Sequence, residues 1–253
     1  MFKNLLLKGC KMEIFNSWIV KDYIAHRGFH NAENPENSLG AFKNAIEEGY
    51  AIELDVQQIA DGTVIVFHDY TLSRMTNKDG YTKNLLKSEL QEYRLSNTQF
   101  FIPTLQQVLD LVEGQVPLLI EIKNECKVGE LEKATLELLK NYNGEYAIQS
   151  FNPYSLEWFK KNAPGIWRGQ LSSFFKGENL SFVKKFALKR MLLNKKISCP
   201  NFISYNVQNL PNRFVKRYKK IPLLAWCVRS QTEYLKAVRF CDNIIFENFE
   251  PKI

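Results

Sequence analysis

Short apolar runs that resemble β-strands alternate with helical patterns from residue 23 to the end of the chain. The strand-like runs are Tyr23–Ala25, Ala51–Ile59, Val64–Phe67, Pro117–Lys123, Tyr146–Ser150, Trp167–Ser172, Asn201–Tyr205, Pro222–Val228 and Asn243–Phe246. Helical spacing of apolar residues separates many of them, as in 39–46, 105–112, 130–142, 155–162, 181–193 and 231–238. Strands that alternate with helices indicate an α/β architecture built on a parallel sheet.

Eight or nine such strands in 253 residues favour a closed (β/α)₈ barrel, the TIM barrel, over an open sheet. A doubly wound sheet is the main alternative, but the chain has neither GxGxxG nor GxxxxGK[ST], the two common nucleotide loops. Asp61-Gly62 is a hairpin-type turn signal. Residues 71–101 are polar and interrupt the alternation, so they are expected to form an excursion from the scaffold.

Residues 1–22 precede the alternation and are expected to be a lead-in to one domain over 23–253. The apolar run Leu5–Leu7 has only three residues, whereas a signal peptide needs about 7–15. No stretch approaches the roughly 18 apolar residues of a membrane span. The five cysteines form no CxxC pair, which is typical of reduced thiols. These features predict a cytoplasmic protein.

Positive charge is concentrated in one region of the chain. Residues 176–220 contain twelve Lys and Arg against one acidic residue, Glu178, while the whole chain has a net charge of +7. Such a region can attract phosphate-bearing substrates or an anionic membrane surface, although solvated helix faces are the ordinary interpretation. Nucleic-acid binding is not expected, because no RRM, helix-turn-helix or zinc-finger pattern accompanies the charge.

Residues able to do chemistry lie in or just after several of the strand-like runs. His26 and His68 each follow a run, and Glu53, Asp55 and Glu121 lie within runs. Alternate residues of a strand share a face, which puts Glu53 and Asp55 about 7 Å apart along the chain. Because the active site of a (β/α)₈ barrel forms where strands meet the following loops, these five side chains are expected to converge.

The three carboxylates suit one Mg²⁺ or Ca²⁺ ion, which prefer oxygen ligands. Zinc is less natural, since neither histidine has a second one at helical ligand spacing. Two histidines beside a phosphate could act as base and acid in an in-line displacement. Arg27 and Lys123 would supply positive charge to the phosphate, and Lys123 could equally hold Glu121 in a salt bridge.

The same residues carry a resemblance to a known family. The motifs, in order, are His26-Arg27-Gly28, Glu36-Asn37-Ser38, Glu53-Leu54-Asp55, His68-Asp69 with Thr71-Leu72-Ser73-Arg74, Ile102-Pro103-Thr104-Leu105 and Glu121-Ile122-Lys123. Their order and spacing resemble the glycerophosphodiester phosphodiesterases. Ser150-Phe151, Ala225-Trp226 and residues 243–251 are weaker landmarks, so the resemblance runs from about Tyr23 to the end of the chain.

The resemblance implies a (β/α)₈ barrel with a small insertion after the second strand, here residues 70–101. It implies a metal on Glu53, Asp55 and Glu121, with His26 and His68 as the acid/base pair. Phosphate contacts would come from Arg27 and Lys123, and Trp226 would line the pocket for the glycerol or headgroup. The implied reaction hydrolyses a glycerophosphodiester to an alcohol and sn-glycerol 3-phosphate, either through a cyclic phosphate or directly with water.

Departures from the family pattern lie late in the chain. Cys227-Val228-Arg229 stands where the family often has Thr and then Asn after the tryptophan, and Glu247 stands where an Asp is usual. Arg229 could therefore contact an acidic headgroup, or could be a rim charge. A lysophospholipid substrate, with the basic helix 181–193 lying on a membrane, is one alternative function. A non-catalytic phosphodiester-binding protein is another. Oligomeric state stays open.

Overall fold

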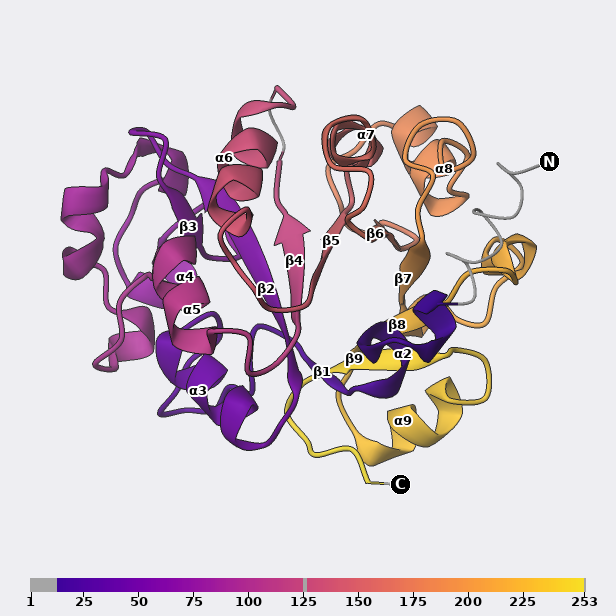
Figure 1. Cartoon of the computed structure of the whole chain (residues 1–253), viewed down its shortest axis with the longest axis horizontal. Coiled ribbons are helices and arrows are strands. Elements are labelled where there is room, and N and C mark those ends of the chain that lie inside the picture. The colour runs from indigo at the N-terminus through magenta and orange to yellow at the C-terminus, as the bar shows by residue number, and fades with distance from the viewer. Residues whose placement is uncertain (1–12, 125–126, 253) are drawn as a thin grey trace. The chain divides into compact units, whose positions relative to one another are not determined.

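The computed structural model describes residues 13–124 and 127–252, which group into two units (Figure 1). The first unit contains residues 25–148. The second unit contains residues 149–252 together with residues 13–24. Two strands, β1 (Ile24–Ala25) and β5 (Tyr146–Ser150), include residues of both units. The predicted lead-in is described only from residue 13, so its first twelve positions lie outside the described residues.

The sheet of the first unit is built on a long buried strand. Strand β2 (Ala51–Gln58) pairs in parallel with β4 (Leu118–Ile122) and antiparallel with β3 (Val64–Val66). A connection too short for a crossover forces the antiparallel β2–β3 pairing. Gly62 has a φ of +86° in that turn, as the Asp61-Gly62 signal requires. Every residue of β2 except the last is buried, as is typical of a strand covered on both faces.

Three helices pack beside one another and against this sheet (Figure 1): α3 (Leu39–Glu47), α5 (Leu105–Val112) and α6 (Glu130–Leu139). Helix α3 begins at Ser38, whose side chain accepts a hydrogen bond from the Ala41 backbone. Helix α5 begins at Thr104, which exchanges hydrogen bonds with Gln107 in a capping box. Serine and threonine are residues that commonly begin a helix in this way.

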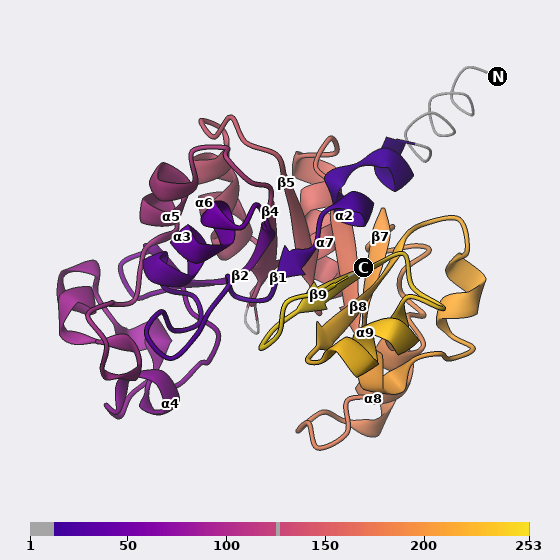
Figure 2. The same cartoon turned by 90° about the horizontal axis from the view of Figure 1, so that it is seen from below.

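Residues 70–101 follow the β2–β3 hairpin and contain only short helices (Figure 2). These are α4 (Ser73–Thr76), η2 (Thr82–Asn84), η3 (Lys87–Glu92) and η4 (Leu95–Asn97). Their apolar side chains, among them Leu72, Leu85 and Leu95, pack in one cluster with Ile65 and Phe67 of the hairpin. The segment is therefore held by an apolar cluster that it shares with the hairpin.

The second unit contains four parallel strands, each paired with the next one along the chain: β6 (Arg168–Ser172), β7 (Phe202–Asn206), β8 (Leu223–Val228) and β9 (Asn243–Phe246). Its helices are η1 (Ile14–Asn16), α2 (Trp18–Lys21), α7 (Pro153–Asn162), α8 (Phe182–Lys189), η5 (Val207–Asn209), η6 (Val215–Tyr218) and α9 (Gln231–Ala237). A doubly wound sheet reverses its strand order at a switch point. These four strands do not reverse.

Asn243 ties the start of the described chain to the last strand. Its side-chain amide donates to the backbone carbonyls of Ile19 and Asp22, at 2.8 Å each. The alternation of strands and helices predicted from the sequence is confirmed over most of the described residues; β2 and β3 form a hairpin, and only the 3-10 helices η5 and η6 lie between β7 and β8. Among these residues the structure contains no helix with the length and apolar character that crossing a bilayer requires.

Candidate metal and phosphate site

Three carboxylates of the first unit meet on one face of its sheet. Glu53 and Asp55 alternate along β2, and Asp55 lies directly opposite Glu121 of β4 in the parallel register. One oxygen of each carboxylate lies within 4.8 Å of the other two, and the residues are 1%, 1% and 8% exposed, respectively. The structure therefore brings together the acidic trio that the sequence singled out.

The charges of this trio are strongly perturbed. Burial, and then repulsion from Asp55 and Glu121, raises the pKa of Glu53 well above its ordinary range, and burial likewise raises the pKa of Glu121. Burial acts the same way on Asp55, but Lys123, His68, Arg27 and His26 outweigh it and lower the pKa of that carboxyl. Converging buried carboxylates are costly unless they are paired or bind a cation. Their oxygen atoms fit a hard divalent cation.

Two cations lie against the trio. Lys123 Nζ is 3.4 Å from Glu121 Oε1 and 3.7 Å from Asp55 Oδ1, and Arg27 Nε is 3.2 Å from Asp55 Oδ2. Burial alone would lower the pKa of Lys123, but Glu121 and Asp55 outweigh it and raise that pKa. Lys123 therefore stays protonated beside the carboxylates, and its ion pair with Glu121 is the structural role foreseen for it.

The turn after β1 brings His26 and Arg27 to the same place. His26 Nε2 lies 4.0 Å from Glu53 Oε2, and the backbone N–H of Arg27 donates to that oxygen at 3.1 Å. Arg27 and Gly28 have φ values of +57° and +81°. A Cβ on Gly28 would lie 2.9 Å from the backbone of Ala41, so only glycine fits this turn.

His68 follows β3 and contacts its neighbour in sequence. Its Nδ1 lies 2.6 Å from Asp69 Oδ1. Burial raises the pKa of Asp69, but hydrogen bonds from His68 and Arg74 outweigh it and lower that pKa. Because an ionised Asp69 can only accept, the hydrogen of the neutral ring belongs on Nδ1, and Nε2 carries the lone pair.

Four polar residues complete the site, and the sequence motifs that contain them did not predict a role for them in it: Glu36, Asn37, Asp69 and Arg74. Arg74 donates to Glu36 and to Asp69, and Arg27 Nη1 donates to Glu36 Oε1 at 2.6 Å. The buried side chain of Asn37 donates to Asp55 Oδ2 at 2.9 Å. The adjacent acid in His68-Asp69 was the available signal for one of them.

The other three predicted site residues, Trp226, Arg229 and Glu247, belong to the second unit and have contacts there. Arg229 Nε donates to Glu247 Oε1 at 2.6 Å. Trp226 packs edge to face on Phe151, with ring centroids 5.5 Å apart. The indole N–H of Trp226 is buried and has no hydrogen-bond acceptor among the described residues.

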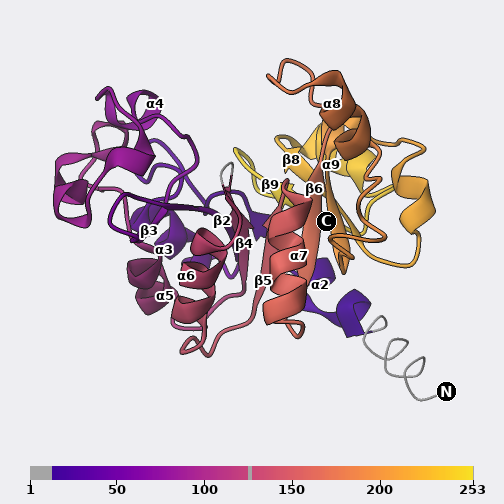
Figure 3. The same cartoon turned by 90° about the horizontal axis from the view of Figure 1, so that it is seen from above.

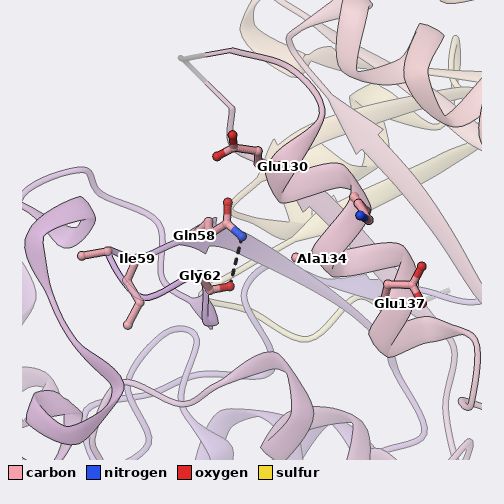
Figure 4. Close-up of a pocket in the computed structure, with 8 residues that line it drawn as sticks. Gln58, Ile59, Gly62, Glu130, Ala134 and Glu137 are labelled. Carbon is pink, nitrogen blue, oxygen red and sulfur yellow. Dashed lines mark hydrogen bonds between the residues drawn. The ribbon is translucent and has the colours of Figure 1, made fainter.

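A separate pocket of the first unit lies between the β2–β3 turn and helix α6 (Figure 4). Its described lining residues, none of which is a predicted site residue, are Gln58, Ile59, Ala60, Gly62, Glu130, Lys133, Ala134 and Glu137. Gln58 Nε2 donates to the Gly62 carbonyl at 3.0 Å across its edge. This pocket contributes nothing to the acidic trio.

Comparison with known proteins points to one family. The chain is 39% identical over 163 residues to the glycerophosphodiester phosphodiesterase of Caldanaerobacter subterraneus subsp. tengcongensis, which covers 58% of this chain and 65% of that relative. It is 35% identical over 154 residues to the glycerophosphodiester phosphodiesterase of Bacillus altitudinis, which covers 56% of this chain and 62% of the relative. The aligned parts thus span less than two thirds of these relatives.

Solved structures have the same fold. An Oleispira antarctica phosphodiesterase in complex with the product sn-glycerol-3-phosphate matches with a TM-score of 0.77 and 24% identity, over 90% of this chain and 93% of that one. The glycerophosphodiester phosphodiesterase of Thermotoga maritima matches with a TM-score of 0.68 and 28% identity, over 88% and 93%. The predicted (β/α)₈ barrel class is therefore confirmed.

The family resemblance seen in the motifs is confirmed by a model of the whole family. The model described as "Glycerophosphoryl diester phosphodiesterase family" matches residues 26–247. The matched region contains every predicted site residue, from His26 to Glu247. This chain therefore belongs to the glycerophosphoryl diester phosphodiesterase family.

Proposed function

We propose that this protein is a metal-dependent phosphodiesterase that hydrolyses glycerophosphodiesters to an alcohol and sn-glycerol 3-phosphate. The observation that carries the proposal is the trio of buried carboxylates with Arg27 and Lys123 beside it. Membership of the family supports the reaction class. The Oleispira antarctica structure, in complex with the product sn-glycerol-3-phosphate, supports the same substrate class.

Glu53, Asp55 and Glu121 would hold one divalent cation, Mg²⁺ or Ca²⁺, because all three offer oxygen atoms within 4.8 Å of one another. When bound, such a cation supplies positive charge beside a phosphoryl oxygen. Arg27 and Lys123 would add fixed positive charge for the same phosphate.

His26 and His68 would be the base and the acid of the displacement. The two histidines lie in different turns. His26 lies near the carboxylate of Glu53, whereas His68 contacts that of Asp69. Because Nδ1 of His68 contacts Asp69, proton transfer by His68 would use its Nε2 atom. Attack by a hydroxyl of the substrate, with its high effective concentration, and attack by water both fit these residues.

On the alcohol side we assign Trp226, with Arg229 and Glu247 as further candidates. Arg229 is already paired with Glu247, so an acidic headgroup would share or replace that carboxylate. We also propose one barrel domain over 23–253 with its insertion at 70–101, and a cytoplasmic location. A lysophospholipid or other lipid diester is the second candidate substrate, favoured by the exposed apolar residues of α8.

The test is release of glycerol 3-phosphate from a panel of glycerophosphodiesters and lysophospholipids by the full chain. The protein is first freed of metal and then supplied with Mg²⁺ or Ca²⁺. Activity should require one of these ions. Full activity in a sample shown by elemental analysis to be metal-free would refute the metal role. Binding of panel compounds without turnover under any metal would instead favour a silent binding protein.

A further inference from the structure

Helix α8 exposes the side chains that a surface helix normally buries. None of its eight residues, all of them described, is buried. Phe182 is 81% exposed and Val183 is 74% exposed. Apolar residues of an amphipathic helix usually face the core, so an outward apolar face needs another explanation.

The helix is attached to its unit through its last turn. Ser172 Oγ donates to the Leu188 carbonyl at 2.9 Å, and the Tyr205 hydroxyl donates to the Lys189 carbonyl at 2.9 Å. Within the part of the chain that the structure describes, no such side-chain hydrogen bond from outside the helix reaches Phe182 or Val183 in its first turn. Figure 3 shows α8 at the outer edge of its own unit.

The exposed apolar residues form one face. Phe186 follows Val183 by three positions and Phe182 by four, and residues at these spacings lie on the same face of a helix. The rings of Phe182 and Phe186 lie 6.3 Å apart, and Leu192, just beyond the helix, is 47% exposed. We call Phe182, Val183 and Phe186 the α8 patch. Exposed apolar side chains that gather on one helix face, with polar residues around them, are typical of an interaction surface.

Positively charged residues adjoin the α8 patch in the sequence. Lys184, Lys185, Lys189 and Arg190 lie in or next to the helix, and the Arg190 guanidinium lies 4.0 Å over the ring of Phe186. In the sequence, residues 179–220 contain no acidic residue at all. A surface with aromatic side chains and cations but no acidic residues complements an anionic membrane, in which negatively charged headgroups cover apolar acyl chains.

We propose that α8 docks this protein on an anionic phospholipid surface. Phe182, Val183 and Phe186 enter the boundary between headgroups and acyl chains, and the Lys and Arg side chains contact lipid phosphates. We choose a lipid surface as the occupant because the same short helix carries both the exposed apolar residues and several cations, with no acidic residue over 179–220. Docking does not depend on the proposed hydrolysis, since no predicted site residue lies in α8.

The test is co-sedimentation of the full chain with vesicles. Phosphatidylcholine vesicles are compared with vesicles that also contain phosphatidylglycerol, at low and high salt. We expect binding only to the anionic vesicles, and weaker binding at high salt. The double variant Phe182→Ser/Val183→Ser should bind about tenfold more weakly. Leu235→Ser, which changes a 54% exposed residue of α9 in the same unit, is the matched control and should bind like the parent.

Charge is tested separately with Lys184→Gln/Lys185→Gln, against Lys43→Gln as a control in the first unit. Absence of binding by the parent protein at low salt would overturn the proposal. Equal binding by the parent and the Phe182→Ser/Val183→Ser variant would also overturn it. Self-association that this variant abolishes would assign the α8 patch to a second copy instead. Hydrolysis of a soluble glycerophosphodiester should be the same in all these variants, so docking and catalysis fail independently.

Discussion

Arg74 and Glu36 form a two-pronged ion pair although 38 positions separate them. Arg74 Nη1 and Nη2 donate to the two carboxylate oxygens of Glu36 at 2.9 and 2.7 Å. The same guanidinium donates to Asp69, the partner of His68, while Glu36 also accepts from Arg27. Arg74 thus joins the turn that carries the first histidine to the turn that carries the second.

Replacing Arg74 should therefore impair turnover more than folding. For Arg74→Gln we expect kcat to fall about tenfold, because small displacements of reacting groups are costly, while KM changes less. Arg74→Lys keeps the charge but not the fork geometry and should recover only part of the loss. Steady-state kinetics and thermal unfolding measure both effects. Arg94→Gln, in the same 70–101 segment, is the control, and an unchanged kcat in Arg74→Gln would contradict the positioning role.

Substitution should reduce activity at the two proposed acid/base histidines, His26 and His68, but not at the third histidine, His30. His26→Ala and His68→Ala should each lower kcat by about 10²–10⁴-fold. His30→Ala also removes an imidazole, at a position four residues after His26 that has no proposed role in proton transfer, and this variant should keep near-parent activity. The measurement is glycerol 3-phosphate release at saturating substrate with metal present. A loss of only a few fold in either proposed variant would remove that residue from the acid/base pair.

The strands and the acidic trio could be predicted because their signals are local. Strand β2 alternates the apolar residues Ile52, Leu54 and Val56 with polar ones, and this period of two puts Glu53 and Asp55 on one side. The hydrogen bonds that cap α3 at Ser38 and α5 at Thr104 join residues three positions apart and are equally local. By contrast, the partners of Arg74 depend on the fold, because no periodicity relates Glu36, Asp69 and Arg74.

Helix α8 was predicted to extend to Leu193, but it ends at Lys189. Met191 has a φ of +51°, a left-handed conformation that cannot continue the helix. The spacing of apolar residues predicted the helix but not which of its faces would be buried. Which face is buried depends on the neighbouring strands, and here the second unit contacts the helix mainly through its last turn.

The acidic trio predicts opposite stability effects for two similar substitutions in the metal-free protein. Glu53→Gln removes a buried charge that two other carboxylates repel, so the free energy of unfolding should rise by about 1 kcal/mol. Asp55→Asn leaves Arg27 and Lys123 without their shared carboxylate, so the free energy of unfolding should fall by about 1–3 kcal/mol. Urea unfolding in metal-free buffer checks both values.

The same two variants should lose the stabilisation that Mg²⁺ or Ca²⁺ gives the parent protein. Glu137→Gln, which changes an exposed carboxylate outside the trio, should keep that stabilisation and is the control. Shifts of the same sign for Glu53→Gln and Asp55→Asn in metal-free buffer would contradict the arrangement of charges described for this site.

Tyr205 predicts how stability changes in alkaline solution. Its ring is fully buried, its hydroxyl donates to the Lys189 carbonyl, and burial raises its pKa to about 12. A raised folded-state pKa means that the neutral hydroxyl contributes its full stability below the unfolded value of about 10. That contribution is lost as pH rises from about 10 to about 12. Tyr205→Phe should cost about 1 kcal/mol near neutral pH, because one hydrogen bond is removed.

Across the alkaline window the parent should lose stability more steeply than Tyr205→Phe, which has no phenol to ionise at this position. Urea unfolding at several pH values measures the two slopes, with Tyr154→Phe, at a half-exposed tyrosine, as the control. Amide hydrogen exchange should also be faster in residues 182–190 of Tyr205→Phe, since the hydroxyl holds the last turn of α8. Identical alkaline slopes for parent and variant would mean that this phenol has the same pKa in the folded and the unfolded protein, which would contradict the raised pKa.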